Sequence, residues 1–139
     1  MKYAIAVLVC LSLIVGCTKA KPKANIPGRV PYVASLDALI GEWDSEGELA
    51  LIVKRVGNEL VVDNPQNDTV RVEISECSST ENSISFTQHH PMQDGSPNLF
   101  SDVACRCTIK TVEGNKDQMV FTISAPEIPQ ESDVYSRRK

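Results

Sequence analysis

Aromatic residues are scarce in this chain of 139 residues, which has three Phe, three Tyr and one Trp. This scarcity argues against a roomy cavity for a large ligand. The chain also lacks an apolar run of the roughly 20 residues that a membrane-spanning helix needs. Its longest apolar segment, residues 4–15, would extend about 18 Å as a helix, against a hydrocarbon core of about 30 Å. A spanning helix is therefore the weaker interpretation of that segment.

Motifs that carry chemistry are missing as well. The sequence has no Gly-rich phosphate loop, no nucleophile elbow and no base placed beside a nucleophile. It has no C-x-x-C pair, and the adjacent His89 and His90 would point to opposite faces of an extended segment. We therefore predict no catalytic residues, no cofactor and no metal, with the two histidines solvated in a loop. The competing hypothesis is a metal site built from these histidines and the cysteines.

The first 17 residues form a distinct unit. Lys2 precedes the apolar segment, which ends in Ile14-Val15-Gly16-Cys17. A basic residue followed by a short apolar run is typical of a cleaved export signal. The stretch resembles a bacterial lipoprotein signal peptide that ends in a lipobox, which implies removal of residues 1–16 and acylation of Cys17. The alternative is an ordinary secretory signal that is cut near Gly16.

The resemblance also implies a location. Acyl chains on Cys17 would anchor the protein to a membrane, because each buried CH₂ contributes about 0.8 kcal/mol. Thr18, in place of an Asp, resembles the address of an outer-membrane lipoprotein in a host that has two membranes. The expected position is therefore the outer membrane, with the domain facing the periplasm.

Residues 17–34 are predicted to be the lipidated cysteine followed by a flexible basic tether. After Cys17 this segment carries four basic and no acidic residues, and it contains three prolines. Extended at roughly 3.1 Å per residue, it would reach about 50 Å. From Ser35 onward the chain has nine basic and 18 acidic residues, a net charge of −9. So acidic a domain argues against a nucleic-acid partner.

Residues 35–139 are predicted to be one all-β domain. A short helix begins it, with Ser35 as N-cap and Gly41 as the residue after its end. Apolar and polar residues then alternate in short segments separated by turn residues, which indicates an antiparallel barrel or sandwich of seven to eight strands. The expected strands are 49–56, 60–62, 69–76, 83–88, 99–112 and 119–124, with 133–139 closing the sheet. Pro126 and Pro129 predict that residues 125–132 are not regular strand.

The helical turn that leads into Gly41-Glu42-Trp43, followed by a series of strands and a last strand with Tyr135 and Arg137, resembles small lipocalin-type barrels. The resemblance implies that Trp43 begins the first strand and packs near an arginine of the last strand. Arg137 is the expected arginine and Arg138 the second choice. The alternative is that Trp43 is an ordinary core residue.

Three cysteines follow the signal and lipobox: Cys77, Cys105 and Cys107. Export to an oxidising compartment permits a disulfide. Cys105 and Cys107 share one strand face about 6.6 Å apart, too far to bond each other easily. We therefore predict a disulfide from Cys77 to Cys105, with Cys107 as the alternative partner and the third thiol left free.

Two functions are compatible with these features. The first is a membrane-anchored envelope lipoprotein whose barrel binds a protein partner or is structural. The second is a lipocalin-like carrier of a small apolar ligand. The interior distinguishes them, because an eight-stranded barrel is just wide enough to be filled by its own side chains or to hold one small ligand. A filled interior would favour the first function; its expected residues are Leu51, Val72, Ile84, Phe86 and Ile109.

Overall fold

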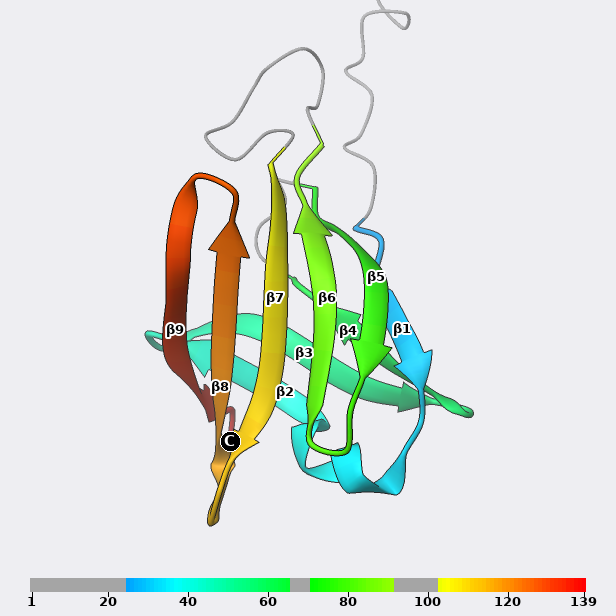
Figure 1. The fold of residues 1–139 in the computed structure, drawn as a ribbon. Coiled ribbons are helices and arrows are strands. Elements are labelled where there is room, and N and C mark those ends of the chain that lie inside the picture. The colour runs from blue at the N-terminus through cyan, green and yellow to red at the C-terminus, as the bar shows by residue number, and fades with distance from the viewer. Residues whose placement is uncertain (1–24, 66–70, 92–102) are drawn as a thin grey trace, which may run out of the picture.

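The computed structural model describes residues 25–65, 71–91 and 103–139 (Figure 1). These residues form an all-β structure with nine strands and one short 3₁₀ helix. In chain order the elements are β1 (Gly28–Pro31), η1 (Ala34–Leu39), β2 (Gly41–Ser45), β3 (Glu48–Val56), β4 (Glu59–Asp63), β5 (Glu73–Ser79), β6 (Ser83–His89), β7 (Ala104–Val112), β8 (Asn115–Ala125) and β9 (Ile128–Arg137).

The nine strands make one antiparallel sheet in the order β1-β4-β3-β2-β9-β8-β7-β6-β5. In Figure 1 the strands β5 to β9 form the front layer, and β2, β3 and β4 run across behind them. The two ends of the sheet meet, because Ile26 forms a parallel bridge with Glu73. The amide of Ile26 donates to the Val72 carbonyl at 2.9 Å, and the amide of Ile74 donates to the Ile26 carbonyl at 2.8 Å. The sheet is therefore a nearly closed barrel.

The alternation of the sequence decides which residues face inward. On β6, Ile84, Phe86 and Gln88 are buried while the residues between them are partly exposed. On β7 the buried positions are Cys105, Cys107 and Ile109. Side chains two apart on a strand share a face, so these positions line one interior. The core cluster also includes Val30, Leu36, Leu39, Trp43, Ala50, Leu51, Val53, Leu60, Val62, Val72, Ile74, Met119, Phe121 and Tyr135.

Strand β1 lies in the segment for which a flexible tether was predicted. Its four residues pair with β4, from Gly28 opposite Val62 to Pro31 opposite Glu59, and Val30 is buried. The strand is short and contains Gly and Pro, so it has no local period that would predict it. Residues 28–31 of the predicted tether are therefore part of the sheet, and β1 makes the ninth strand where seven to eight were expected.

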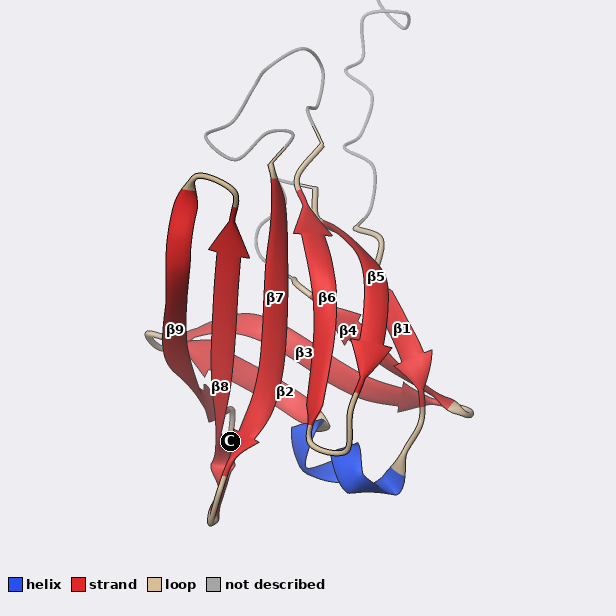
Figure 2. Ribbon diagram, in the orientation of Figure 1, coloured by secondary structure: helices blue, strands red, loops and turns tan. Residues whose placement is uncertain are grey.

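The helix begins two residues earlier than predicted, whereas Gly41 follows its C-cap as expected. Val33 is its N-cap, without a side-chain capping bond, and Ile40 is its C-cap. The expected cap, Ser35, lies inside the helix. Leu36 and Leu39 are buried and hold η1 across one end of the barrel (Figure 2). Within the ranges that the structure describes, no helix has the length and apolar character to cross a membrane.

Residues 125–132 contain more strand than predicted. β8 extends to Ala125, β9 begins at Ile128, and the two form a hairpin. The register shifts between Ile123 and Ala125, which pair with Glu131 and Ile128. Pro129 lies in this irregular stretch, where a missing amide donor is tolerated. The prolines therefore mark the turn and a bulge and do not interrupt the sheet.

Candidate functional site

Trp43 and Arg137 lie side by side where the barrel closes. Trp43 is fully buried on β2 and pairs with Arg137 of β9 in the antiparallel register. The guanidinium carbon of Arg137 is 4.4 Å from the centroid of the Trp43 ring. The indole nitrogen of Trp43 donates to the Leu39 carbonyl at 2.9 Å, which ties the ring to η1.

Arg137 also donates to three backbone carbonyls. Its Nη1 donates to Ile40 at 2.7 Å, and its Nη2 donates to Ala38 at 2.8 Å and to Lys116 at 2.9 Å. A Cβ at Gly41 would collide with Nη1 of this arginine, so glycine permits the close approach. These contacts join η1, β2, β8 and β9. Because protein groups engage the donors of Arg137, its role is structural.

The second-choice arginine is placed differently. Arg138 is exposed, and its Nε lies 3.7 Å from Oδ1 of Asp44. Its amide donates to the Glu42 carbonyl at 2.8 Å. Arg138 therefore extends the pairing of β9 with β2, while the side chain over the indole is that of Arg137.

The predicted disulfide is not formed: Cys77, Cys105 and Cys107 are free thiols. Strand β6 runs between β5, which carries Cys77, and β7, which carries the other two. Two strand spacings amount to about 9.5 Å, beyond the roughly 4.4–6.8 Å that a disulfide allows between Cα atoms. Burial raises the pKa of all three thiols, that of Cys107 to about 12.

Cys77 lies at the seam between the two ends of the sheet. A Cβ built on Gly28 of β1 would collide with the sulfur of Cys77 and with the Ile74 side chain. The backbone of β1 therefore approaches β5 closely at this point. The thiol is half-buried and packs against the seam.

Polar side chains gather at the end of the barrel opposite η1. The side-chain Nδ2 of Asn64 donates to Oε1 of Gln88 at 3.2 Å, and both residues are buried. Nε2 of Gln88 lies 3.3 Å from Nε2 of His90, and burial lowers the pKa of His90. His89 is the last residue of β6 and not a loop residue. Within the described ranges no three His, Cys, Asp or Glu side chains are grouped as metal ligands.

The residues expected to fill the interior do so. Leu51, Val72, Ile84, Phe86 and Ile109 are each at most 2% exposed and belong to one continuous core cluster. They come from β3, β6, β7 and the approach to β5, so they meet from both layers of the barrel. This part of the interior is packed protein.

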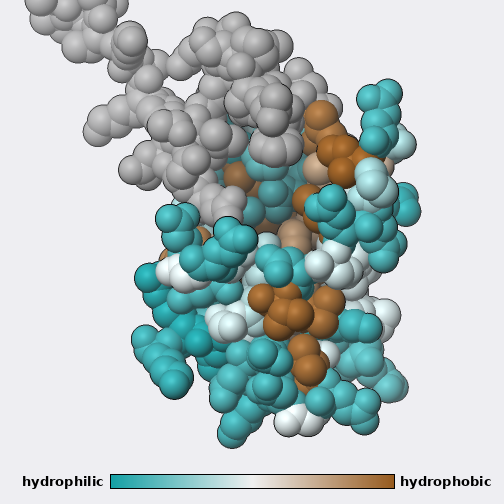
Figure 3. All heavy atoms as spheres, turned by 90° about the vertical axis from the view of Figure 1, so that its left-hand side faces the viewer, coloured by the Kyte–Doolittle hydropathy of each residue, from teal (hydrophilic) through white to brown (hydrophobic). Residues whose placement is uncertain are grey.

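The outer surface is polar over most of the face seen in Figure 3, where apolar residues form a small central patch and a separate group near the top. Ile128 and Val134 are the large exposed apolar residues of β9, 42% and 49% exposed. They are six positions apart, about 20 Å along a strand. An extensive apolar docking face is therefore not seen on this strand.

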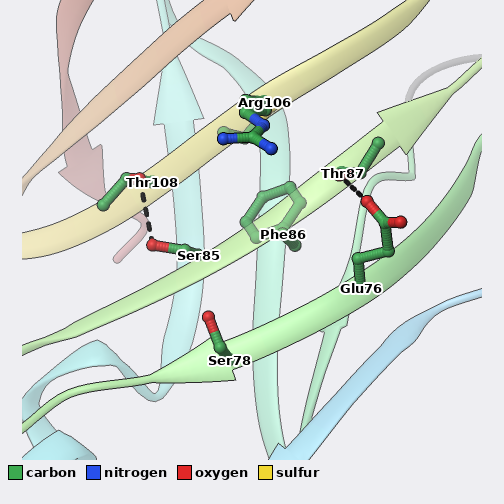
Figure 4. A pocket seen from close by; sticks show the side chains of 8 residues that line it. Glu76, Ser78, Ser85, Phe86, Thr87, Arg106 and Thr108 are labelled. Carbon is green, nitrogen blue, oxygen red and sulfur yellow. Dashed lines mark hydrogen bonds between the residues drawn. The ribbon is translucent and has the colours of Figure 1, made fainter.

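A polar hollow of about 350 Å³ lies on the outer face of β5, β6 and β7 (Figure 4). It is lined by Glu76, Ser78, Ser85, Phe86, Thr87, Arg106, Cys107 and Thr108. A second hollow of about 400 Å³ shares Glu76, Thr87 and Arg106 with the first and continues onto β8 at Ser124 and Ala125. We call the two together the outer groove.

Hydroxyl side chains form a row across the outer groove and beyond it. Ser78, Ser85, Thr108, Thr122 and Ser132 are register partners in succession from β5 to β9. Ser85 and Thr108 are hydrogen-bonded at 3.1 Å, and Thr122 and Ser132 at 2.9 Å. The small side chains of this row leave the groove open and offer rotatable donors and acceptors.

Sequence reasoning did not find the outer groove. Its charged residues, Glu76 and Arg106, are 30 positions apart, and each looks like an ordinary solvated charge of a strand. The two residues are brought to one groove by the pairing of β5, β6 and β7. Cys17, the predicted lipid-attachment residue, lies outside the described residues.

We compared the chain with protein-family models, with curated proteins and with solved structures, and none of the three comparisons gives a match.

Proposed function

We propose that this chain is a bacterial envelope lipoprotein whose barrel binds a protein partner through its outer surface. The acyl chains on Cys17 anchor it to the outer membrane, and the domain faces the periplasm. The packed part of the interior supports the second half of the proposal: bulky residues of both layers occupy space that a carrier would keep for a ligand. We therefore expect the partner to bind the outer surface of the barrel.

The start of the barrel limits how far the domain stands from its anchor. Asn25 is held on both sides: its Nδ2 donates to the Asn64 carbonyl at 2.8 Å, and its Oδ1 accepts from the Val72 amide at 2.9 Å. The proposed tether is therefore limited to the seven residues between Cys17 and Asn25. Fully extended, such a tether would reach about 22 Å at roughly 3.1 Å per residue, less than half the distance that the sequence predicted.

Lipidation is tested by growing cells with a clickable palmitate analogue. The chain is expected to take up the label, whereas Cys17→Ser should take up none and run as a longer precursor. Cys10→Ser is the matched control, because that thiol lies in the segment removed with the signal; it should mature and label normally. A labelled, shortened Cys17→Ser protein would contradict the anchor.

The mode of binding is tested by native mass spectrometry of the purified protein. We expect the mass of the lipidated chain with no further small molecule. A retained apolar ligand in stoichiometric amount would support the carrier hypothesis and contradict binding through the exterior.

A further inference from the structure

The outer groove contains an arginine, Arg106, whose charge is not engaged by other described residues. Arg106 is exposed on β7, and within the described residues its guanidinium makes no hydrogen bond and no ion pair. This contrasts with Arg137, whose donors are engaged by three carbonyls. A guanidinium presents a planar fork of N–H donors that matches a carboxylate or phosphate in bidentate geometry.

A bulge in β5 places a carboxylate in the same groove. Regular alternation after Ile74 would turn Glu76 toward the interior, opposite Phe86. The register instead shifts between Ser75 and Ser78, and Glu76 adopts a φ of 50°. A left-handed conformation costs a non-glycine residue stability, and bulges of this kind re-aim side chains. Glu76 consequently lies on the outer face.

Thr87 separates the two charges. It pairs with Arg106 across β6 and β7, and its hydroxyl donates to Oε2 of Glu76 at 2.8 Å (Figure 4). Arg106 and Glu76 form no ion pair with each other, so each keeps capacity for a ligand. The outer groove thus offers a forked donor, an acceptor and a row of hydroxyls at fixed positions.

These features select among ligand classes. A phosphate would bring up to two negative charges into the groove that holds Glu76, and it carries no N–H donor for that carboxylate. A sugar ring would need an exposed aromatic face to stack on, but Phe86, the aromatic residue of the lining, is buried. An added β-strand is excluded because β6, β7 and β8 are paired on both edges. What remains is a carboxylate with an N–H donor close beside it.

The geometry points to the outer groove as a binding site for a peptide that ends in a free carboxylate. Arg106 receives the terminal carboxylate, Glu76 accepts from a peptide N–H, and the hydroxyls of Ser85 and Thr108 contact the remaining polar atoms. This inference rests on the proposed function, because it names the chemistry by which a partner would meet the exterior of the barrel.

The test is an NMR titration of the ¹⁵N-labelled whole chain in mild detergent with N-acetyl-Ala-Ala. A probe of about 14 heavy atoms is expected to bind with a dissociation constant on the order of 1 mM. Amide signals of β6 and β7 and the Arg106 Nε–H signal should shift. The C-terminal amide of the same dipeptide, glucuronate and inorganic phosphate should each bind at least tenfold more weakly.

Substitutions in β7 test whether the peptide binds at Arg106. Arg106→Gln should lower the affinity at least tenfold, and Arg106→Lys, which keeps the charge and loses the fork, should lower it severalfold. Lys110→Gln is the matched control: Lys110 lies four residues along on the same face of β7, outside the groove, so the affinity should not change. Equal melting temperatures confirm that each variant is folded.

The titration can overturn the inference in four ways. Absence of binding, equal binding of the acid and its amide, or an unchanged affinity in Arg106→Gln would each do so. Equal or tighter binding of glucuronate or phosphate would exclude the peptide class. None of these outcomes depends on acylation, so failure here is distinct from failure of the membrane anchor.

Discussion

The guanidinium of Arg137 covers the indole of Trp43, and this pair joins β9, the last strand of the barrel, to β2. The arginine donates on one side to carbonyls that end η1 and on the other to the start of β8. One side chain therefore holds the helix that covers one end of the barrel, together with three strands.

Replacing Arg137 with Gln should destabilise the protein by about 2–4 kcal/mol, because hydrogen bonds from a charged group and a cation–π contact are lost together. The stability of Arg137→Lys should lie between that of the unchanged protein and that of Arg137→Gln, because a lysine ammonium keeps the charge but cannot reach several carbonyls at once. Urea unfolding followed by Trp43 emission measures the effect. The neighbouring Arg138→Gln is the control, and its single 3.7 Å contact with the partly exposed Asp44 should contribute less than about 1 kcal/mol. Equal losses for the two arginines would contradict the role given to Arg137.

The three thiols should remain separate. Peptide mapping without reductant is expected to recover Cys77, Cys105 and Cys107 unlinked. At pH 8 the folded protein should react slowly with iodoacetamide because the raised pKa values leave little thiolate, and Cys107 should be the slowest. Urea should make all three reactive. A peptide linking Cys77 to Cys105 would mean that the paired strands rearrange.

Alkaline pH should weaken the fold through Tyr135. Its pKa is raised to about 12, first by burial and then by Asp133, above the value of 10.0 for a free tyrosine. The folded state thus holds the proton that the unfolded state releases, so this stabilisation is present below pH 10 and is lost as the pH rises toward 12. Urea midpoints at pH 8, 10 and 11 measure the loss, and Tyr135→Phe should reduce it. An identical loss in that variant would contradict the assignment.

The turn between β2 and β3 should accept a stabilising substitution. Glu46 and Gly47 have φ values of 53° and 85°, the pattern of a two-residue type I′ turn. Asparagine tolerates this conformation better than glutamate does, so Glu46→Asn should add about 0.5–1 kcal/mol. Thermal melting measures the gain. Glu81→Asn, in an exposed turn without a positive φ, is the control and should have little effect.

The seam of the barrel should be intolerant of a methyl group. Gly28→Ala would bring a Cβ into the Ile74 side chain and the Cys77 sulfur, and overpacking of this kind costs about 1–3 kcal/mol. Adding Cys77→Ala should recover part of the loss, because it removes one of the two collisions. Equilibrium unfolding of the two single variants and the double variant gives the coupling. Purely additive losses would indicate that the seam is not tightly packed at Cys77.

Local pattern was enough to predict most of the sheet. Each inward position of β6 and β7 follows from alternation, which every strand repeats along its own length. The motif around Trp43 and the terminal arginines pointed to two residues that the structure places in contact, because the strands that carry them are neighbours in a closed sheet. Lipidation of Cys17 stays a prediction from sequence.

Other features depend on neighbours far along the chain. β1 is a strand because β4 and β5 lie beside it, and its own residues carry no such signal. The disulfide failed as a prediction because the sequence does not state that β6 separates Cys77 from the other thiols. Glu76 reaches the outer face through a bulge that the pairing with β6 creates.

By itself, then, the sequence determined the all-β class, the buried face of most strands and the acidic character of the domain, because these follow from residue type and spacing along the chain. The tertiary structure alone decided which strands are adjacent, how the barrel closes, and that Arg106 and Glu76 share one groove. Strand pairing sets these relationships, and it depends on hydrogen bonds and packing between segments that are distant in sequence.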